Sequence, residues 1–265
     1  MFWVRFRSSV VLVIIAVSTL ILGGNVLFSA ILAISLIGMM ELYRTIKLNK
    51  SLIAILGYVA AVLFDLIIKF HMEKYNMLFI ILFLLLLMMI YVFTYPRYHI
   101  EEISIIFFGL FYVAVMLSFV YQVRMLTDGF ILVWLIFIGA WGSDTCAYCV
   151  GILIGKHKIL PKLSPKKSLE GCIGGVLGAA LLGFIYAGIL KDNIAGGGNP
   201  QIAYAIICGI SSIISQLGDW AASAIKRNHD IKDYGNLIPG HGGILDRFDS
   251  IIFVAPVVYI LSNIL

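Results

Sequence analysis

The chain has 265 residues, of which 62% are hydrophobic and only 12% are charged. A soluble domain of this length needs more polar surface than this composition provides, so lipid must form part of the protein's solvent. The net charge of +5 does not indicate nucleic-acid binding, because the Lys and Arg residues lie between apolar runs, where membrane orientation and anionic headgroups account for them.

Apolar runs predict the membrane spans in chain order, since a spanning helix needs about 20 apolar residues. The first run is short and follows Arg5 and Arg7, as in a signal peptide. No cleavage site follows it and another run begins at once, so we count it as a span. The runs cover residues 10–22, 26–43, 52–68, 77–95, 103–123, 130–154, 172–190, 202–225 and 248–265.

These runs predict an all-α, polytopic integral membrane protein with about nine transmembrane helices. Residues 1–125 would form N-terminal membrane helices, and residues 126–265 would form C-terminal helices and cytoplasmic loops that carry a catalytic site. With the N-terminus inside, only Lys69, Lys74, Arg124 and Lys191 of the 19 Lys and Arg residues fall outside. This asymmetry favours that orientation, with the long polar loops 155–171 and 226–247 on the cytoplasmic side.

Four acidic residues fall within the apolar runs: Glu41, Asp65, Asp144 and Asp219. A carboxylate at mid-bilayer costs about 2.5–3.5 kcal/mol on insertion scales, so each needs a partner, a cavity or a function. Glu41 and Asp65 lie near the ends of their runs, where snorkelling or a helix–helix polar contact is the favoured explanation. Asp219 differs, because Ser223, Lys226 and Arg227 continue its helical stripe toward the surface.

The loop from Lys226 to Arg247 contains the groups needed to handle a polyphosphate. Lys226, Arg227, Lys232 and Arg247 supply positive charge, and Gly240, Gly242 and Gly243 let the backbone approach a ligand. Asp246 and Asp249 lie three residues apart at the start of the last run, and such oxygen ligands suit Mg²⁺. A passive cytoplasmic loop is the alternative, and it fits this mixture of charges and glycines poorly.

The residues from Ser223 to Asp249 resemble the signature of the phosphatidate cytidylyltransferases, also called CDP-diacylglycerol synthases. The shared pattern is S-x-x-K-R-x4-K-D, a small residue, then P-x-H-G-G, a hydrophobic residue and x-D-R-x-D, over 27 residues. The loop Ser164–Gly171 (SPKKSLEG) and the segment from Asp144 to Gly151 also resemble this family. The resemblance covers about the C-terminal half of the chain.

The resemblance implies that CTP and phosphatidic acid give CDP-diacylglycerol and pyrophosphate, with one or two Mg²⁺ ions. Asp144, Asp219, Asp246 and Asp249 would hold the metal, and Asp219, Asp246, Lys226 and Arg247 would be the catalytic group. Substrate phosphates would contact residues of both cytoplasmic loops: Ser223, Arg227, Lys232, His241, Gly242, Gly243, Lys166 and Lys167. His241 could instead shape its loop, and Lys166 and Lys167 could simply anchor theirs at the membrane surface.

Two other functions would use some of the same residues. A CTP-dependent kinase for a polyprenol or phytol would release CDP instead of pyrophosphate, and a transporter would use Asp144 and Asp219 as ion sites. The transporter hypothesis predicts paired repeats, and the sequence has no internal repeat. The short loops favour a bacterial inner membrane. Gly174, Gly175 and Gly178 on one span are compatible with a homodimer, but also with packing inside one chain.

Overall fold

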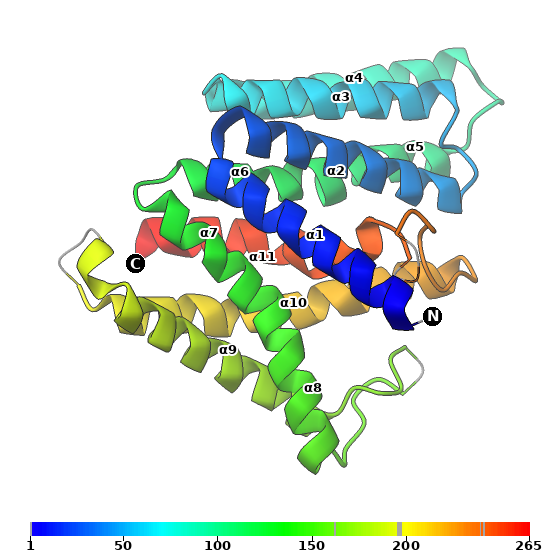
Figure 1. Ribbon diagram of the computed structural model, residues 1–265. Coiled ribbons are helices and arrows are strands. Elements are labelled where there is room, and N and C mark those ends of the chain that lie inside the picture. The colour runs from blue at the N-terminus through cyan, green and yellow to red at the C-terminus, as the bar shows by residue number, and fades with distance from the viewer. Residues whose placement is uncertain (1, 162, 195–197, 239, 241) are drawn as a thin grey trace. The chain divides into compact units, whose positions relative to one another are not determined.

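The computed structural model describes residues 2–161, 163–194, 198–238, 240 and 242–265. This part of the chain is helical and contains no β-strand (Figure 1). Two of the short elements, η2 and η3, are π-helical turns inside longer helices, and η1 and η4 are 3₁₀ turns. The elements are α1 (Phe2–Leu22), α2 (Gly24–Thr45), α3 (Leu52–Lys69), η1 (Glu73–Tyr75), α4 (Asn76–Phe93), α5 (Ile100–Gly109), η2 (Leu110–Val115), α6 (Met116–Met125), α7 (Gly129–Phe137), η3 (Ile138–Gly142), α8 (Ser143–Ile154), α9 (Leu169–Ile189), η4 (Lys191–Asn193), α10 (Pro200–Asn228) and α11 (Leu245–Ile264).

The prediction of an all-α polytopic membrane protein is confirmed. Among the described residues, eight helices are long and apolar enough to cross a membrane, and the apolar helix over Val10–Leu22 is shorter. Eight of the nine predicted runs coincide with a helix or a continuous series of helices to within three residues at each end, and the first run, residues 10–22, forms the C-terminal part of α1. The count of nine spans and the inside position of the N-terminus stay predictions.

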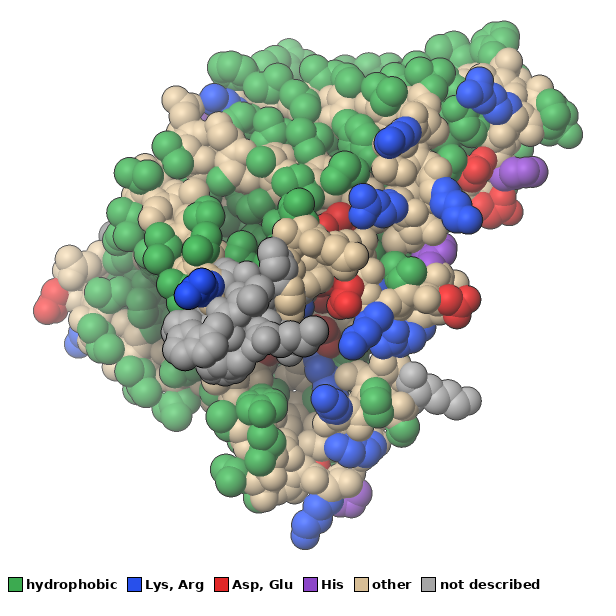
Figure 2. Space-filling view, turned by 45° about the vertical axis from the view of Figure 1, so that its right-hand side comes forward, with side chains coloured by type: hydrophobic (Ala, Val, Ile, Leu, Met, Phe, Trp, Pro, Cys, Tyr) green, Lys and Arg blue, Asp and Glu red, His purple; other side chains and the backbone are tan. Residues whose placement is uncertain are grey.

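Large hydrophobic side chains lie on the outside of these helices, as expected for a protein in lipid. In α4, Met77 is 70% exposed and Phe93 is 82% exposed. Figure 2 shows hydrophobic side chains over much of the face in view. In water, apolar exposure on this scale would mark an aggregation site, whereas the acyl chains of a bilayer cover it without a free-energy cost.

The chain forms two compact units, and neither is a single stretch of sequence. The first contains Met1–Ser118 and Ile231–Arg247, and the second contains Phe119–Asp230 and Phe248–Leu265. In the first unit, Tyr43 is fully buried and donates its hydroxyl to the Ile106 carbonyl at 2.9 Å. Gly57 and Gly109 flank this side chain, where a Cβ would lie within 3 Å of its hydroxyl oxygen. The predicted division between residues 125 and 126 was drawn by function and stays a prediction.

In the second unit, α9 packs against both α8 and α10 (Figure 1). Small residues let these helices approach closely: Gly174 faces Val150, and Gly178 faces Cys146. Ser143 and Ser212 share a buried hydrogen bond of 2.6 Å, which links α8 to α10. The glycine stripe of α9 therefore packs within the chain, the second of the two uses that the sequence allowed.

We expect Gly178→Val to destabilise the second unit by about 1–3 kcal/mol, the usual cost of overpacking a core. A Cβ at Gly178 would lie 2.5 Å from both Cβ and Sγ of Cys146, so α8 and α9 would have to separate. Thermal unfolding in detergent measures the effect. Gly198→Ala is the control, because a Cβ at Gly198 would have no atom of the described residues within 4 Å. Equal unfolding temperatures for the two variants would contradict this packing.

Candidate active site

A cavity of about 660 Å³ lies in the second unit and gathers residues from the first of the two predicted cytoplasmic loops, 155–171, and from nearby membrane helices. Its lining comes from α8, from the segment that joins α8 to α9, and from α9 and α10. The polar and charged residues around it are Asp144, Lys158, Ser164, Lys166, Lys167, Ser168, Gln216, Asp219 and Ser223. Five of the predicted site residues, Asp144, Lys166, Lys167, Asp219 and Ser223, therefore share one cavity.

Lys167 and Asp219 form an ion pair at this cavity. The distance from Lys167 Nζ to Asp219 Oδ2 is 2.5 Å, and the two side chains are 27% and 30% exposed. The ammonium also lies 5.7 Å from the ring centroid of Trp220. Asp144 lies close enough for the charges of Lys167 and Asp219 to act on it. The cavity thus holds two carboxylates on α8 and α10 with a cation beside them.

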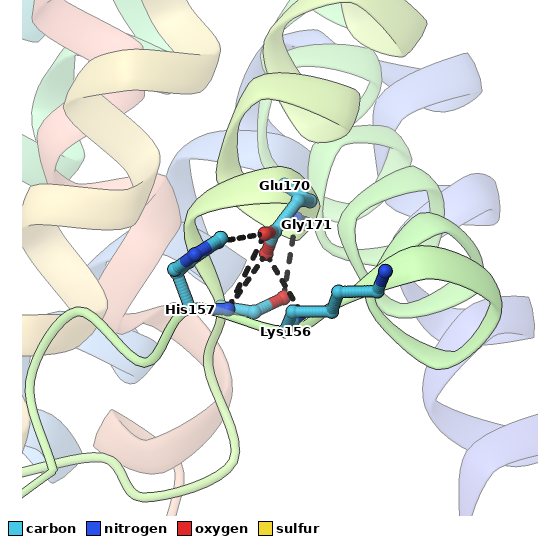
Figure 3. Close-up of polar contacts among 5 residues, drawn as sticks. Lys156, His157, Glu170 and Gly171 are labelled. Carbon is cyan, nitrogen blue, oxygen red and sulfur yellow. Dashed lines mark hydrogen bonds and ion pairs between the residues drawn. The ribbon is translucent and has the colours of Figure 1, made fainter.

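Glu170 fixes the segment that carries Lys166 and Lys167 (Figure 3). Its Oε2 accepts hydrogen bonds from the backbone N–H of Lys156 at 3.0 Å and of His157 at 3.2 Å, and its Oε1 lies 2.6 Å from His157 Nδ1. These contacts join the end of α8 to the start of α9. Ser168 caps α9 by accepting from the Gly171 N–H at 3.2 Å. Both ends of the connection between α8 and α9 are thereby held in place, and Lys158 and residues 164–168 line the cavity.

The last turn of α10 and the first turns of α11 carry further predicted residues. Lys226 and Arg227 lie in the last turn of α10, half-buried and exposed respectively. Gly218 lets α11 approach α10, because a Cβ there would lie 3.0 Å from the Asp249 carbonyl oxygen and 2.7 Å from the Phe253 ring. The backbone of Asp249 therefore lies next to the residue that precedes Asp219. Asp249 is buried, and its Oδ1 accepts from the Ser250 N–H at 2.8 Å.

The glycine-rich part of the signature belongs to the first unit and turns sharply. Gly240 and Gly242 have φ of 79° and 85°, a region that side chains with a Cβ rarely adopt, and the Ile238 N–H donates to the Gly242 carbonyl at 3.0 Å. Asp246 Oδ2 accepts from the Tyr234 N–H at 2.8 Å and the Gly243 N–H at 2.9 Å. Asp246 therefore orders this segment, and Lys232 and Arg247 are exposed on it.

Glu41 accepts hydrogen bonds from this segment, whereas the sequence analysis favoured snorkelling or a polar contact between helices. Glu41 is 3% exposed and accepts from the backbone N–H groups of Ile244 at 3.0 Å and Leu245 at 2.8 Å. It thus satisfies N–H groups at the start of α11, as a capping carboxylate does. Asp65 is also 3% exposed, and neither of its carboxylate oxygens has a hydrogen-bond partner among the described residues.

Some predicted assignments stay predictions. Asp219 and Asp246 belong to different units, so their meeting at one metal ion is a prediction, and His241 lies outside the described residues. Within the described residues, no group of three or more His, Cys, Asp or Glu side chains converges on one point. Asp144 and Asp219 at the cavity are the described pair whose surroundings fit a hard cation, because an ammonium already lies against one of them.

A family model described as the cytidylyltransferase family matches residues 3–265 of the chain. The chain belongs to this family. The match includes all five charged residues that line the cavity: Asp144, Lys158, Lys166, Lys167 and Asp219. It also extends over the N-terminal helices, whose sequences show no motif of their own.

Curated bacterial proteins resemble part of the chain. A phosphatidate cytidylyltransferase of Bacillus subtilis is 41% identical over 141 residues, which cover 53% of this chain and 51% of the relative. That of Staphylococcus saprophyticus is 40% identical over 54% of this chain and 52% of the relative, and that of Thermotoga maritima is 40% identical over 49% and 48%. The chain thus spans about half the length of the curated relatives it matches.

Sequence reasoning missed three residues that shape the site of this family member. Glu170 and Gln216 lie inside or beside the quoted motifs, but their role depends on backbone partners: Gln216 Nε2 donates to the Cys172 carbonyl at 3.1 Å. Glu41 lies about two hundred positions before its partners, so nothing in the local sequence connects them. The one available signal was that all three are polar residues in or next to apolar runs.

Proposed function

We propose that the chain transfers a cytidylyl group from CTP to phosphatidic acid, giving CDP-diacylglycerol and pyrophosphate. The observation that carries the proposal is the cavity in which two carboxylates of membrane helices, Asp144 and Asp219, face the cations Lys166 and Lys167. Membership of the cytidylyltransferase family and the names of the curated relatives support the same reaction. The identity of both substrates is part of the proposal, because the match to the curated relatives covers only about half of the length of each relative.

The chemistry explains why such a site needs charge more than a strong base. A phosphate oxygen of phosphatidic acid, already ionised near neutral pH, forms a bond to the α-phosphorus of CTP. The bond from that phosphorus to the bridging oxygen breaks, and pyrophosphate leaves with the electron pair. Because an anion attacks another anion, most of the acceleration must come from positioning and from neutralisation of charge.

Residues of the second unit would carry much of this work. Lys167, released from Asp219 when substrate binds, would neutralise phosphate oxygens, and Lys166 and Ser223 line the same cavity. Lys226 and Arg227 would contact the triphosphate from the end of α10. Asp144 and Asp219 would hold Mg²⁺, which when bound supplies a further positive charge for the substrate phosphates. Asp249, buried beside Gly218, would support the metal site.

The signature segment of the first unit would supply the remaining contacts. Its positive-φ glycines leave backbone N–H groups close to a ligand, as in other phosphate-binding turns. Gly242, Gly243, Lys232 and His241 would contact substrate phosphates, and Arg247 would clamp one of them in a fork. Asp246 would serve as a metal ligand through the oxygen that does not accept from Tyr234 and Gly243.

The charge distribution supports a site on the cytoplasmic face of a bacterial inner membrane. Fifteen of the 19 Lys and Arg residues fall in the segments predicted inside, and the relatives named above are bacterial. The cavity lies at the ends of apolar helices, so phosphatidic acid would reach it from the bilayer and CTP from the aqueous side. No nucleic acid takes part in this proposal, and a homodimer stays an additional possibility for assembly.

Two labels on CTP test the reaction and separate it from the kinase alternative. Purified protein receives Mg²⁺, CTP labelled either at the α- or at the γ-phosphate, and either phosphatidic acid or a polyprenol as the lipid. Cytidylyl transfer predicts label in the lipid from the α-position and labelled pyrophosphate from the γ-position. Transfer of γ-label to a lipid alcohol, with CDP as the other product, would replace the proposal with a lipid kinase. Absence of any labelled lipid or pyrophosphate would refute it.

A further inference from the structure

Glu41 lies outside every motif quoted above, yet its carboxylate contacts Gly235, Gly243, Ile244 and Leu245 of the signature segment. It comes from α2, and its two oxygens take different backbone donors: Oε1 accepts from Ile244 and Oε2 from Leu245. These N–H groups lie where α11 begins, and a helix has no internal acceptor for its first N–H groups. A carboxylate at this position is also favoured by the positive end of the helix dipole.

The segment passes so close to Glu41 that two of its residues have no room for a side chain. A Cβ at Gly243 would lie 2.5 Å from each carboxylate oxygen of Glu41. A Cβ at Gly235 would collide with Oε1 of the same carboxylate. Because neither glycine has a positive φ, closeness to Glu41 and not backbone conformation restricts these two positions.

A second carboxylate holds the same segment from within. Asp246 Oδ2 accepts from the N–H groups of Gly243 and Tyr234. Gly243 therefore lies between the two carboxylates, one from α2 and one from α11. If Glu41 lost its hydrogen bonds, the start of α11 would be released, and with it the side chains of Asp246 and Arg247.

We infer that Glu41 is a positioning residue for cytidylyl transfer, acting through the Gly235–Arg247 segment and not on the substrates. The inference rests on the proposed function, because that function defines the reaction that Glu41 would affect. The contacts of Glu41 do not depend on that function. Burial of an acid is not sufficient for such a role: Asp65 is equally buried, and its oxygens have no hydrogen-bond partner among the described residues. Asp65 therefore provides the control.

The test compares Glu41→Gln with Asp65→Asn in the full-length protein. Glutamine keeps the length of the side chain but presents an N–H₂ group to one of the two backbone donors, so one hydrogen bond is lost and two donors face each other. We expect turnover to fall about tenfold or more in Glu41→Gln, because a small displacement of catalytic groups has effects of this size. Asp65→Asn should stay within about twofold of wild type.

Hydrogen exchange supplies a readout that does not depend on activity. In Glu41→Gln, the peptide with Ile244 and Leu245 should exchange faster, while peptides of α9 and α10 keep their wild-type rates. A general loss of stability would instead accelerate exchange in all of them. If Glu41→Gln does not fold, Gly235→Ala takes its place, because it keeps every polar group and displaces the carboxylate. It should show the same local exchange and a reduced turnover.

The outcomes separate this inference from the proposed function. Wild-type turnover or unchanged exchange at Ile244 and Leu245 in Glu41→Gln, or in Gly235→Ala where that variant replaces it, would overturn the inference. An equal loss of turnover in Asp65→Asn would also overturn it, since any buried acid would then suffice. If the wild-type protein makes no CDP-diacylglycerol at all, the proposed function fails, and faster local exchange in Glu41→Gln would still support the structural role.

Discussion

Asp219→Asn should lower the rate of CTP- and phosphatidate-dependent pyrophosphate release by about 10³-fold or more. The substitution keeps the shape of the side chain but removes the charge that faces Lys167 and that would hold Mg²⁺. Because the pair with Lys167 is about 30% exposed, its loss should change the free energy of unfolding by no more than about 1 kcal/mol. The expected result is therefore an inactive protein with nearly unchanged stability.

Asp192→Asn is the matched control for this variant. Asp192 is an exposed acid in η4, between α9 and α10, and it does not line the cavity. Its substitution should leave pyrophosphate release within about twofold of wild type. An active Asp219→Asn protein would remove Asp219 from the metal and catalytic groups, whatever the state of Asp246.

Lys167→Met should lower the same rate by about 10²-fold, the size of effect seen when a group that stabilises developing charge is removed. Methionine fills a similar volume without the ammonium, so the loop held by Glu170 should keep its path. The loss should be partly restored in Lys167→Arg, since a guanidinium also binds phosphate. Initial rates at saturating CTP measure the effect.

Lys156→Met distinguishes a catalytic charge from a charge that only anchors the loop. Lys156 is an exposed cation of the same loop, and it does not line the cavity. If the loop cations serve only as a positive-inside signal, the two methionine variants should lose activity equally. A loss confined to Lys167→Met is the result that the site requires.

The membrane helices could be predicted from the sequence because one physical rule determines them. An apolar run of about 20 residues must satisfy its backbone internally, so it forms a helix and its limits follow from composition. The π-helical turns could not be predicted in this way. In the turn at Ile138–Gly142, Gly139 packs against Ser211 of α10, where a Cβ would lie 2.7 Å from that side chain, and the local sequence does not indicate such a long-range contact.

Most of the charged residues of the cavity could be predicted from the sequence, but the contacts between them could not all be predicted. Asp144, Lys167 and Asp219 stood out because charged groups in or beside apolar runs need a reason. That Lys167 pairs with Asp219 follows from the fold of the 155–168 loop, which Glu170 fixes through backbone contacts. Glu41 shows the limit most clearly, because its partners are backbone N–H groups that any residue type can supply.

The two-unit organisation could not be predicted from the sequence either, because it also depends on long-range contacts. The signature reads as one continuous motif from Ser223 to Asp249, yet Ile231–Arg247 belongs with the N-terminal helices and the flanking residues belong with the second unit. Glu41 and the buried contacts of Asp246 tie that middle part to its unit. Spacing along the sequence carries no information about such long-range hydrogen bonds, so the motif alone could not indicate them.

The most direct test of the central claim is to locate where CTP binds. A photoreactive CTP analogue is cross-linked to the purified protein with Mg²⁺, and the labelled peptides are identified by mass spectrometry. We expect label on the peptides that carry Lys158–Ser168 or Gln216–Ser223, and its loss when unlabelled CTP is in excess. Label at a separate cavity of the second unit, about 280 Å³ and lined by Asp128, Asn199 and Tyr204, would contradict the account.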